Sequence, residues 1–285
     1  MVAKGSLLRW LYGSAPHAWG AEPNDFDPAR VAATIEAVTG PLFGPRGWFR
    51  VEAKGFENIP PAPVMIVANH SGGTTIPDVW GFVWLWYRAF GTRRPLHPSA
   101  HEMVLSVAAV ARWFAQRGVV RADPALAARI LSEWRHDLMV MPGGEVDTWR
   151  PWRRRYEVEF AGRTGYARAA LRARVPIVPV AHAGAHDTLM VLTDGRRFAE
   201  LIGLKRIARS AVWPVHLSLP WGLALGPWPH LPVPATLRYR VGAPIAPPAS
   251  LGPGDEPDES MVRAHDERVR AAVQSLLDAL RDERR

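Results

Sequence analysis

Three short apolar runs constrain the fold of this chain more than any other feature. Each is rich in Val, Ile or Met and leads into a loop that contains Gly or His; they are residues 64–68, 138–141 and 175–180. Runs of this length are typical of buried strands. Segments with helical spacing separate them, at residues 79–90, 102–115, 124–135 and 162–174. The alternation predicts an α/β fold with a largely parallel central sheet flanked by helices, and a site at the carboxyl edge of the strands.

Further elements extend the sheet and close the chain. Residues 48–53 and 236–241 alternate between apolar and polar side chains, which predicts two half-buried strands. Residues 260–280 carry one apolar face and predict a C-terminal amphipathic helix. We therefore divide the chain into an N-terminal helical or interfacial segment (1–45), a main domain (46–245), and a linker with the C-terminal helix (246–285).

Prolines set expectations about where elements begin and end. Asp123 precedes Pro124 and is predicted to cap the helix that starts there. A helix over residues 30–38 is expected to stop at the pair Gly40-Pro41. Pro176 and Pro179 predict that the third apolar run lies at an edge of the sheet or at a bulge.

Composition narrows the class of partner. The 285 residues include no Cys, which excludes disulfides and thiolate zinc sites. The formal net charge of +8 favours an anionic partner: nucleic acid, a membrane surface or a phosphorylated ligand. Thirteen Trp residues favour the membrane, because Trp prefers the membrane–water interface. We expect no nucleic-acid partner, because the sequence shows no Lys/Arg stripe or recognisable binding module.

Two stretches predict membrane contact. Residues 210–237 hold no charged residue but three Trp and six Pro, and basic residues flank them. This composition suits shallow docking on anionic lipid; the alternative is a Pro-rich segment that wraps the core. The apolar residues 7–12 are either an interfacial segment or a helix that caps the core. Because no run is long enough to cross a bilayer and no export signal is recognisable, we expect a peripheral protein on the cytoplasmic face of the membrane.

The candidate site begins where the first apolar run ends, at Asn69-His70. Gly72 and Gly73 follow, and Asp78 stands at the start of the next helix. A His at a strand end with a downstream carboxylate suits a general base and the group that orients it. The N–H groups of the two glycines are candidate donors to a developing oxyanion. The alternative is an ordinary surface histidine in a βα loop.

The loop after the second run repeats this arrangement with Gly143-Gly144-Glu145. Four arginines interleaved with two tryptophans come next, the first of them Arg150. A guanidinium fork and the N–H groups of a Gly-Gly turn both suit phosphate, so Arg150 is a candidate anion-binding residue; the alternative is a solvated basic face. Asp147 and the pair His186-Asp187 also lie near predicted strand ends and are candidates for part of the same machinery.

Four sequence blocks occur in a characteristic order. They are Asn69-His70 with Asp78, Gly118-Val119-Val120-Arg121, Pro142-Gly143-Gly144-Glu145 and Val175-Pro176-Ile177-Val178-Pro179-Val180. In this order the chain resembles the glycerolipid (lysophospholipid) acyltransferase superfamily over residues 48–245. The likeness is to its bacterial, 1-acylglycerol-3-phosphate acyltransferase-like branch, with some similarity to the diacylglycerol acyltransferase type. The ordered set is more specific than any single block.

The resemblance implies an enzyme of phospholipid and lipid metabolism, with residues 46–245 as its acyltransferase domain. It would move an acyl chain from acyl-CoA or acyl-carrier protein to a glycerolipid or lysophospholipid hydroxyl. His70 would be the general base and Asp78 its orienting partner. Because a thioester is already activated, we expect no metal and no cofactor besides the acyl donor. Substrate binding would fall to Asn69, Gly72, Gly73, Arg121, Gly143, Gly144, Glu145 and Arg150.

The chain departs from the family pattern at two places. Seven residues separate His70 from Asp78, where the family usually has four. Gly143 stands where many relatives carry Glu, and the acidic residue comes later, at Glu145. These departures keep two alternatives open: a catalytically degenerate lipid-binding protein, and a thioesterase-like hydrolase in which water replaces the acceptor. The sequence has no Gly-x-Ser-x-Gly elbow, as a serine hydrolase would require.

Overall fold

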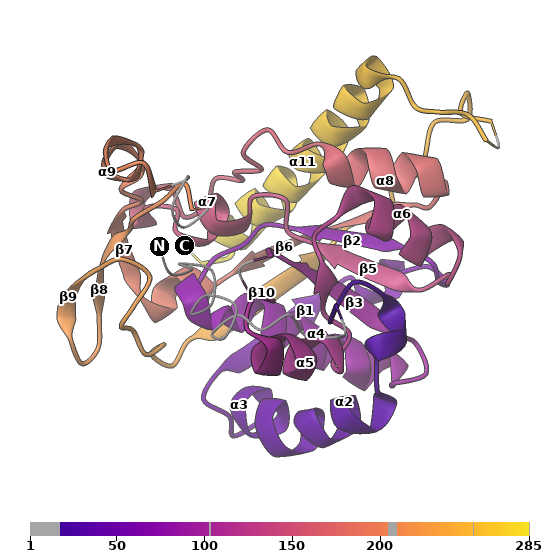
Figure 1. Cartoon of the computed structure of the whole chain (residues 1–285). Coiled ribbons are helices and arrows are strands. Elements are labelled where there is room, and N and C mark those ends of the chain that lie inside the picture. Colours follow the sequence, from indigo (N-terminus) through magenta and orange to yellow (C-terminus); the bar gives the residue numbers. More distant parts are fainter. Residues whose placement is uncertain (1–17, 103, 205–209, 253, 285) are drawn as a thin grey trace, which may run out of the picture.

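The computed structural model describes residues 18–102, 104–204, 210–252 and 254–284 (Figure 1). A central sheet lies between two layers of helices, as the alternation of strands and helices predicted. The apolar stretch 7–12, for which we expect interfacial or capping contact, lies outside the described residues.

The main sheet has seven strands in the order β1-β10-β6-β2-β5-β3-β4. These strands are β1 (Arg50–Lys54), β2 (Met65–Ala68), β3 (Leu96–Ala100), β4 (Val120–Arg121), β5 (Asp137–Val140), β6 (Ile177–Ala183) and β10 (Thr236–Val241). From β6 to β4 all neighbours are parallel, whereas β10 is antiparallel to β6 and parallel to β1. The sheet is therefore largely parallel, which confirms the predicted fold class.

Helices cover both faces of the sheet because its central strands are apolar on both sides. The helices are α2 (Pro28–Thr34), α3 (Gly40–Phe43), α4 (Pro77–Phe90), α5 (Ala108–Ala115), α6 (Pro124–Ser132), α7 (Gly144–Thr148), α8 (Gly165–Ala173), α9 (Arg196–Leu201) and α11 (Glu259–Asp282). In β2, Met65 and Val67 share one core with α6, α8 and α11. Ile66 and Ala68 share the other core with α2, α3 and α4, on the opposite side of the sheet (Figure 1).

Capping residues and apolar patterns in the sequence predicted several helices correctly. The Asp123 side chain accepts a hydrogen bond from the Leu126 N–H and caps α6, as predicted. The C-terminal amphipathic helix is confirmed as α11. The helix predicted from residue 102 begins only at Ala108, after a series of turns. The nearly uniformly apolar α4 serves two purposes: Phe82 and Trp86 are fully buried in the core, whereas Trp80 lines the cavity described below.

The edge position or bulge predicted for the third apolar run is wrong, because β6 lies between β10 and β2 in a continuous register. Pro179 is tolerated because it lies where the pairing with β10 ends, at Val180. Its carbonyl accepts a hydrogen bond from the Gly242 N–H at 2.9 Å. Proline keeps its carbonyl acceptor, so the residue still contributes one bond at the end of this ladder.

The helix predicted over residues 30–38 does not stop at Gly40-Pro41. α2 continues into a π-helical turn, Ile35–Thr39, and then into α3. Within this turn the Gly40 N–H donates to the Ile35 carbonyl. The wider turn relieves the clash that a proline ring makes with the carbonyl four residues earlier in a regular α-helix.

A second, three-stranded antiparallel sheet stands beside the main one (Figure 1). It is formed by β7 (Met190–Thr193), β8 (Val215–Ser218) and β9 (Gly222–Leu225). β8 and β9 form a hairpin within the proline-rich segment 210–237, and their paired residues contain no proline. This hairpin was not predicted from the sequence. Among the described residues, no helix has the length and apolar character needed to cross a membrane.

Candidate active site

The candidate site lies where three adjacent parallel strands end. β6, β2 and β5 are neighbours in the sheet, and their carboxyl ends carry His182, His70 and the loop Pro142–Glu145. The carboxyl edge of a parallel sheet is where α/β proteins bind ligands. The fold therefore gathers at one edge the loops that the sequence singled out separately.

The loop after β2 is folded so that Asp78 returns to His70. Gly72 and Gly73 have φ values of 99° and 67°, and Ile76, at φ 42°, also lies in the left-handed region. A side chain at Gly72 would come within 2.7 Å of the Pro77 ring, so the turn requires glycine there. The seven intervening residues are taken up in this compact turn, and Asp78 enters the site from the first turn of α4.

His70 and Asp78 form a hydrogen-bonded pair. The His70 Nδ1 lies 2.6 Å from Asp78 Oδ2, and the Ser71 N–H donates to the same oxygen at 3.0 Å. The Asp78 side chain is fully buried and that of His70 is 13% exposed. Because a carboxylate only accepts, it fixes the Nδ1–H tautomer of His70 and leaves the Nε2 lone pair free to take a proton. This is the arrangement of a general base with an orienting carboxylate.

A second histidine, which the sequence reasoning missed, reaches the same carboxylate. His182 Nε2 lies 3.4 Å from Asp78 Oδ2 and 2.8 Å from Ser71 Oγ. Burial lowers the pKa of His182 to about 4, so this ring is neutral near pH 7. Its position at the end of the third apolar run was the only available signal. His182 thus adds a neutral polar contact beneath the His70–Asp78 pair.

The charge on Asp78 is maintained despite its burial. Burial by itself would raise the pKa of this carboxyl, but His70 and His182 and the hydrogen bonds of His70 and Ser71 outweigh it and lower the pKa below its usual value. The position in the first turn of α4 also suits a negative charge. Asp78 is therefore a carboxylate throughout the neutral range.

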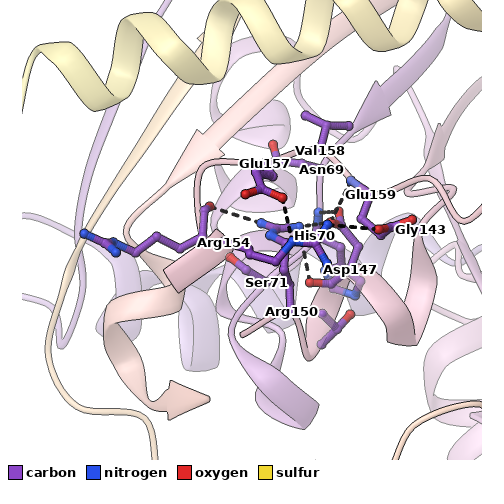
Figure 2. A network of polar contacts seen from close by, with 12 residues as sticks. Asn69, His70, Ser71, Gly143, Asp147, Arg150, Arg154, Glu157, Val158 and Glu159 are labelled. Carbon is purple, nitrogen blue, oxygen red and sulfur yellow. Dashed lines mark hydrogen bonds and ion pairs between the residues drawn. The ribbon is translucent and has the colours of Figure 1, made fainter. Parts of the chain in front are cut away.

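Asp147 supports the backbone of His70. Its carboxylate accepts hydrogen bonds from the His70 N–H at 2.5 Å and the Glu159 N–H at 3.2 Å, and it forms an ion pair with Arg150. Figure 2 shows Asp147 between His70, Arg150 and the segment 157–159. Asp147 and Arg150 are both buried. The sequence had named Asp147 only as a candidate for part of the machinery; the structure places it behind His70, where it fixes the main chain.

A cavity of about 910 Å³ opens beside His70 and is lined mostly by apolar side chains. Cavities of this size suit small-molecule and lipid ligands. Among the residues singled out from the sequence, those that line it are His70, Gly73, Arg121, Gly144 and Glu145. Gly73 therefore lines the cavity, whereas Gly72 packs against Pro77 and Ala185.

The cations of the cavity differ in how they are paired. Arg121 forms an ion pair with Glu102 and donates to the Trp19 carbonyl at 3.1 Å. Arg163 is exposed and donates to the carbonyls of Pro142 and Gly143, both at 3.1 Å. Within the described part of the chain Arg163 has no carboxylate partner. Arg117 also lines the cavity without a carboxylate partner in the described chain, but it donates to Thr34 Oγ1 and stacks on the Trp113 ring. Arg163 is therefore the unneutralised cation that lies at the Gly143-Gly144 turn.

Three residues that the sequence assigned to substrate binding have other contacts. The Asn69 side chain donates to the His182 carbonyl at 3.0 Å and accepts from the His182 N–H at 2.9 Å. These two bonds connect the end of β2 to β6. Gly143 is buried, and a side chain there would come within 2.1 Å of the Glu159 carbonyl. Arg150 is buried against Asp147. Polar residue type alone does not distinguish a ligand contact from a buried structural bond.

The basic run after the second strand is not one phosphate site. Arg154 pairs with Glu157 and Glu159, and Arg155 stacks on the Trp152 ring at 3.5 Å. Within this run, the acidic residues that follow it neutralise Arg154, and Asp147, which precedes it, neutralises Arg150. The pair His186-Asp187 does not line the cavity: Asp187 pairs with Arg284, just beyond the end of α11, at 2.6 Å. Within the described residues, no group of three or more His, Cys, Asp or Glu side chains is placed so that it could hold a metal ion.

Buried histidines make the stability of the fold depend on pH. Burial lowers the pKa of His97, His182, His230 and His265 to about 4. The unfolded chain therefore binds protons that the folded chain does not between about pH 6.5 and 4. We expect the free energy of unfolding to be highest above about pH 6.5 and to fall as the pH approaches 4, as measured by urea unfolding across this range.

The variant His265→Leu provides the control for this expectation. His265 lies on α11, far along the chain from the candidate site, and within the described structure neither ring nitrogen has a hydrogen-bond partner. Its replacement should reduce the pH dependence, because one of the four buried histidines is then removed from the proton balance. A free energy of unfolding that is constant from pH 7.5 to 4.5 would contradict the assignment of neutral buried histidines.

Comparison with known proteins agrees with this architecture. Residues 50–183 match the sequence model of the family described as Acyltransferase. An uncharacterized protein of Mycobacterium tuberculosis is 29% identical over 253 residues, which covers 88% of this chain and 67% of the relative. An uncharacterized protein of Mycobacterium leprae is 28% identical over 221 residues, which covers 77% of this chain and 57% of the relative. The matched part thus spans 57–67% of these relatives' length.

A solved structure shares the fold. The 1-acyl-sn-glycerophosphate (LPA) acyltransferase of Thermotoga maritima superimposes with a TM-score of 0.50 and 17% sequence identity, over 87% of this chain and 78% of that one. At this level of identity the likeness concerns the arrangement of the sheet and its helices.

Proposed function

We propose that this chain belongs to the glycerolipid acyltransferase superfamily, since residues 50–183 match the Acyltransferase family model and the fold resembles a solved 1-acyl-sn-glycerophosphate acyltransferase. The enzyme transfers an acyl chain from acyl-CoA or acyl-carrier protein to a glycerolipid hydroxyl, with His70 as general base. The single observation that carries the proposal is the His70–Asp78 pair at the wall of a large, mostly apolar cavity. A base in such a cavity can meet both a hydroxyl and an acyl chain.

The proposed step follows from the geometry of the pair. His70 Nε2 removes the proton from the acceptor hydroxyl as its oxygen attacks the thioester carbonyl carbon. Asp78 accepts from Nδ1–H and stabilises the imidazolium that forms. The N–H of Gly73 is the candidate donor to the oxyanion. When the carbon–sulfur bond breaks, the imidazolium returns its proton to the leaving thiolate, and an ester and a free thiol result.

The acceptor that the cavity suits best is a lysophospholipid or another glycerolipid that carries phosphate. Arg163 supports this choice, because its charge is not neutralised by a carboxylate of the described chain and its guanidinium lies at the Gly143-Gly144 turn. Arg121, which the resemblance assigned to the acceptor, also lines the cavity but is paired with Glu102. A lipid acceptor also agrees with a peripheral position on the cytoplasmic face of the membrane, which forms part of the proposal.

An acceptor panel tests the function. Purified protein is incubated with labelled acyl-CoA and with lysophospholipids, monoacylglycerol, diacylglycerol or no acceptor, and acylated product and free thiol are measured. We expect both to depend on a phosphate-bearing acceptor. Arg163→Ala is expected to raise the KM for that acceptor roughly tenfold, since a hydrogen bond to a charged group contributes about 1.5–3 kcal/mol. KM for monoacylglycerol should be unchanged.

The matched control is Arg153→Ala, which removes an exposed arginine that does not line the cavity. Thiol release that needs no acceptor would indicate the hydrolase. Lipid binding without any turnover would indicate the degenerate binding protein. Equal KM values for Arg163→Ala and the parent protein would remove Arg163 from acceptor binding.

A further inference from the structure

The small sheet β7–β8–β9 is apolar on the side that faces solvent. Met190 pairs with Leu217, and Leu217 pairs with Leu223, so these three side chains form one row across the sheet. They are 40%, 42% and 62% exposed. The next row, Val191, His216 and Ala224, points inward and is buried. An ordinary surface sheet presents polar side chains to solvent, whereas this sheet is apolar on its outward face as well as largely apolar on its inward one.

Neighbouring elements extend this apolar surface. α9, β7, β8 and β9 gather on one side of the molecule, beyond the layers of the main sheet (Figure 1). Large apolar side chains that are at least 42% exposed continue through these elements and the loops after them: Leu192, Phe198, Leu201, Ile202, Leu219, Trp221, Leu225, Trp228 and Leu231. Soluble monomers rarely expose so many large apolar groups together, so this surface needs a partner.

The surface is continuous with the substrate cavity. Trp228 is 55% exposed on it and, with Pro227, also lines the cavity. The Thr74 N–H donates to His230 Nε2 at 3.1 Å, and the Thr74 hydroxyl donates to the Pro227 carbonyl at 2.9 Å. The loop that carries His70 is therefore joined to the base of the small sheet, and a partner that covers the sheet lies next to the entrance of the site.

Charge and composition favour lipid as this partner. Residues 210–237 include no charged residue, whereas Trp221 and Trp228 have the amphipathic side chains that settle at the membrane–water interface. Arg197, on α9, is exposed at the margin of the apolar surface, and the chain as a whole carries a net charge of +8. Both favour an anionic surface. Among the described residues, β7 and β9 each pair with a strand on one side only, and the unpaired main-chain groups of edge strands limit insertion to the headgroup region.

We propose that β7, β8, β9 and α9 form a membrane-docking surface, defined by Met190, Leu217, Leu223, Leu225 and Trp221, that seats the molecule on an anionic bilayer with the cavity entrance at the lipid headgroups. The partner of this surface is a lipid bilayer, and the row of outward side chains enters its interfacial layer. This docking deepens the proposed function, because a lipid acceptor then reaches His70 without crossing water.

The test is flotation with vesicles of phosphatidylcholine and phosphatidylglycerol at a 7:3 ratio. We expect the parent protein to bind and the double variant Leu223→Ser, Leu225→Ser to bind roughly 100-fold more weakly, because each leucine loses the burial of an apolar side chain. Val38→Ser is the matched control: Val38 is an apolar side chain, 44% exposed, in the layer of α2 and α3. It should bind like the parent protein. Circular dichroism and thermal unfolding verify that the outward-facing variants fold.

A second measurement separates docking from catalysis. Acyl transfer between short-chain substrates dispersed as monomers should be equal in the parent protein and the double variant. If the parent protein docks but transfers nothing, the proposed function fails and the docking surface stands. If the double variant floats like the parent protein, the docking surface is wrong whatever the activity. The lipid-docking proposal would also fail if the parent protein formed a dimer without lipid and the double variant were monomeric. That result would make the surface a protein interface.

Discussion

His70→Ala is expected to lower the rate of acyl transfer about 10²–10⁴-fold without unfolding the protein, because general base catalysis typically contributes this much. The His70 ring is 13% exposed and its Nδ1 is held by Asp78 at 2.6 Å, so the ring is positioned rather than packed into the core. The measurement is kcat with a saturating acceptor, for protein whose circular dichroism and unfolding midpoint match those of the parent protein. Near-normal activity of folded His70→Ala would show that another group is the base.

Asp78→Asn is the companion variant. The amide retains the shape of the side chain but not its charge, and it can donate to His70 Nδ1, which favours the wrong tautomer. We expect kcat to fall by roughly 10²-fold or more, with little change in the KM for the acyl donor. His101→Gln serves as control, because His101 lines the cavity without contributing to the His70–Asp78 pair. A kcat for Asp78→Asn equal to that of this control would remove Asp78 from the mechanism.

Arg150→Met is expected to produce the largest loss of stability, about 3–5 kcal/mol in the free energy of unfolding. The substitution leaves Asp147 as a buried carboxylate without its cation. Burial lowers the pKa of Arg150 to about 10, so the guanidinium is still protonated near pH 7 and the pair is ionic. Urea unfolding measures the effect, and the exposed Arg153→Ala should stay within about 0.5 kcal/mol of the parent protein.

The double variant Asp147→Leu, Arg150→Met distinguishes the structural role from anion binding. With both charges removed, a large part of the lost stability should return, because a buried pair is costly chiefly when one partner is missing. The His70 N–H then loses its acceptor, so we expect kcat of the double variant to be lower than that of the parent protein even though its stability returns. A stable Arg150→Met protein with a raised KM for phosphate-bearing acceptors would restore the anion-binding role that the sequence suggested.

The sequence predicted those parts of the molecule that depend on neighbouring residues. Short apolar runs bounded by Gly and Pro gave β2, β5 and β6, and the Asp123-Pro124 pair gave the start of α6. His70 was a sound candidate because the abrupt end of a strand is itself a local signal. The turn that returns Asp78 to His70 was foreseeable only as a possibility, since it depends on positive φ at Gly72, Gly73 and also at Ile76.

The roles of several polar residues could not be predicted, because their partners are distant in the sequence. Asn69 bonds His182, 113 residues away, and the His70 N–H bonds Asp147, 77 residues away. Which side chains meet at the sheet edge depends on the strand order, and only long-range pairing sets that order. The sequence therefore indicated the loops that meet at the sheet edge. It assigned Asn69 and Arg150 to substrate binding, whereas their hydrogen bonds and ion pair connect them to the scaffold.

By itself, then, the sequence determined the α/β class, most strands of the main sheet, and the loop that carries His70, because each rests on periodicity and turn chemistry within a few residues. Tertiary structure alone decided that β6, β2 and β5 lie side by side, that His182 and Asp147 surround the His70–Asp78 pair, and that Arg150 is buried. It also decided which face of β7, β8 and β9 is exposed. The physical reason is that burial, and with it the partner of a charge, is a property of packed neighbours rather than of the residue.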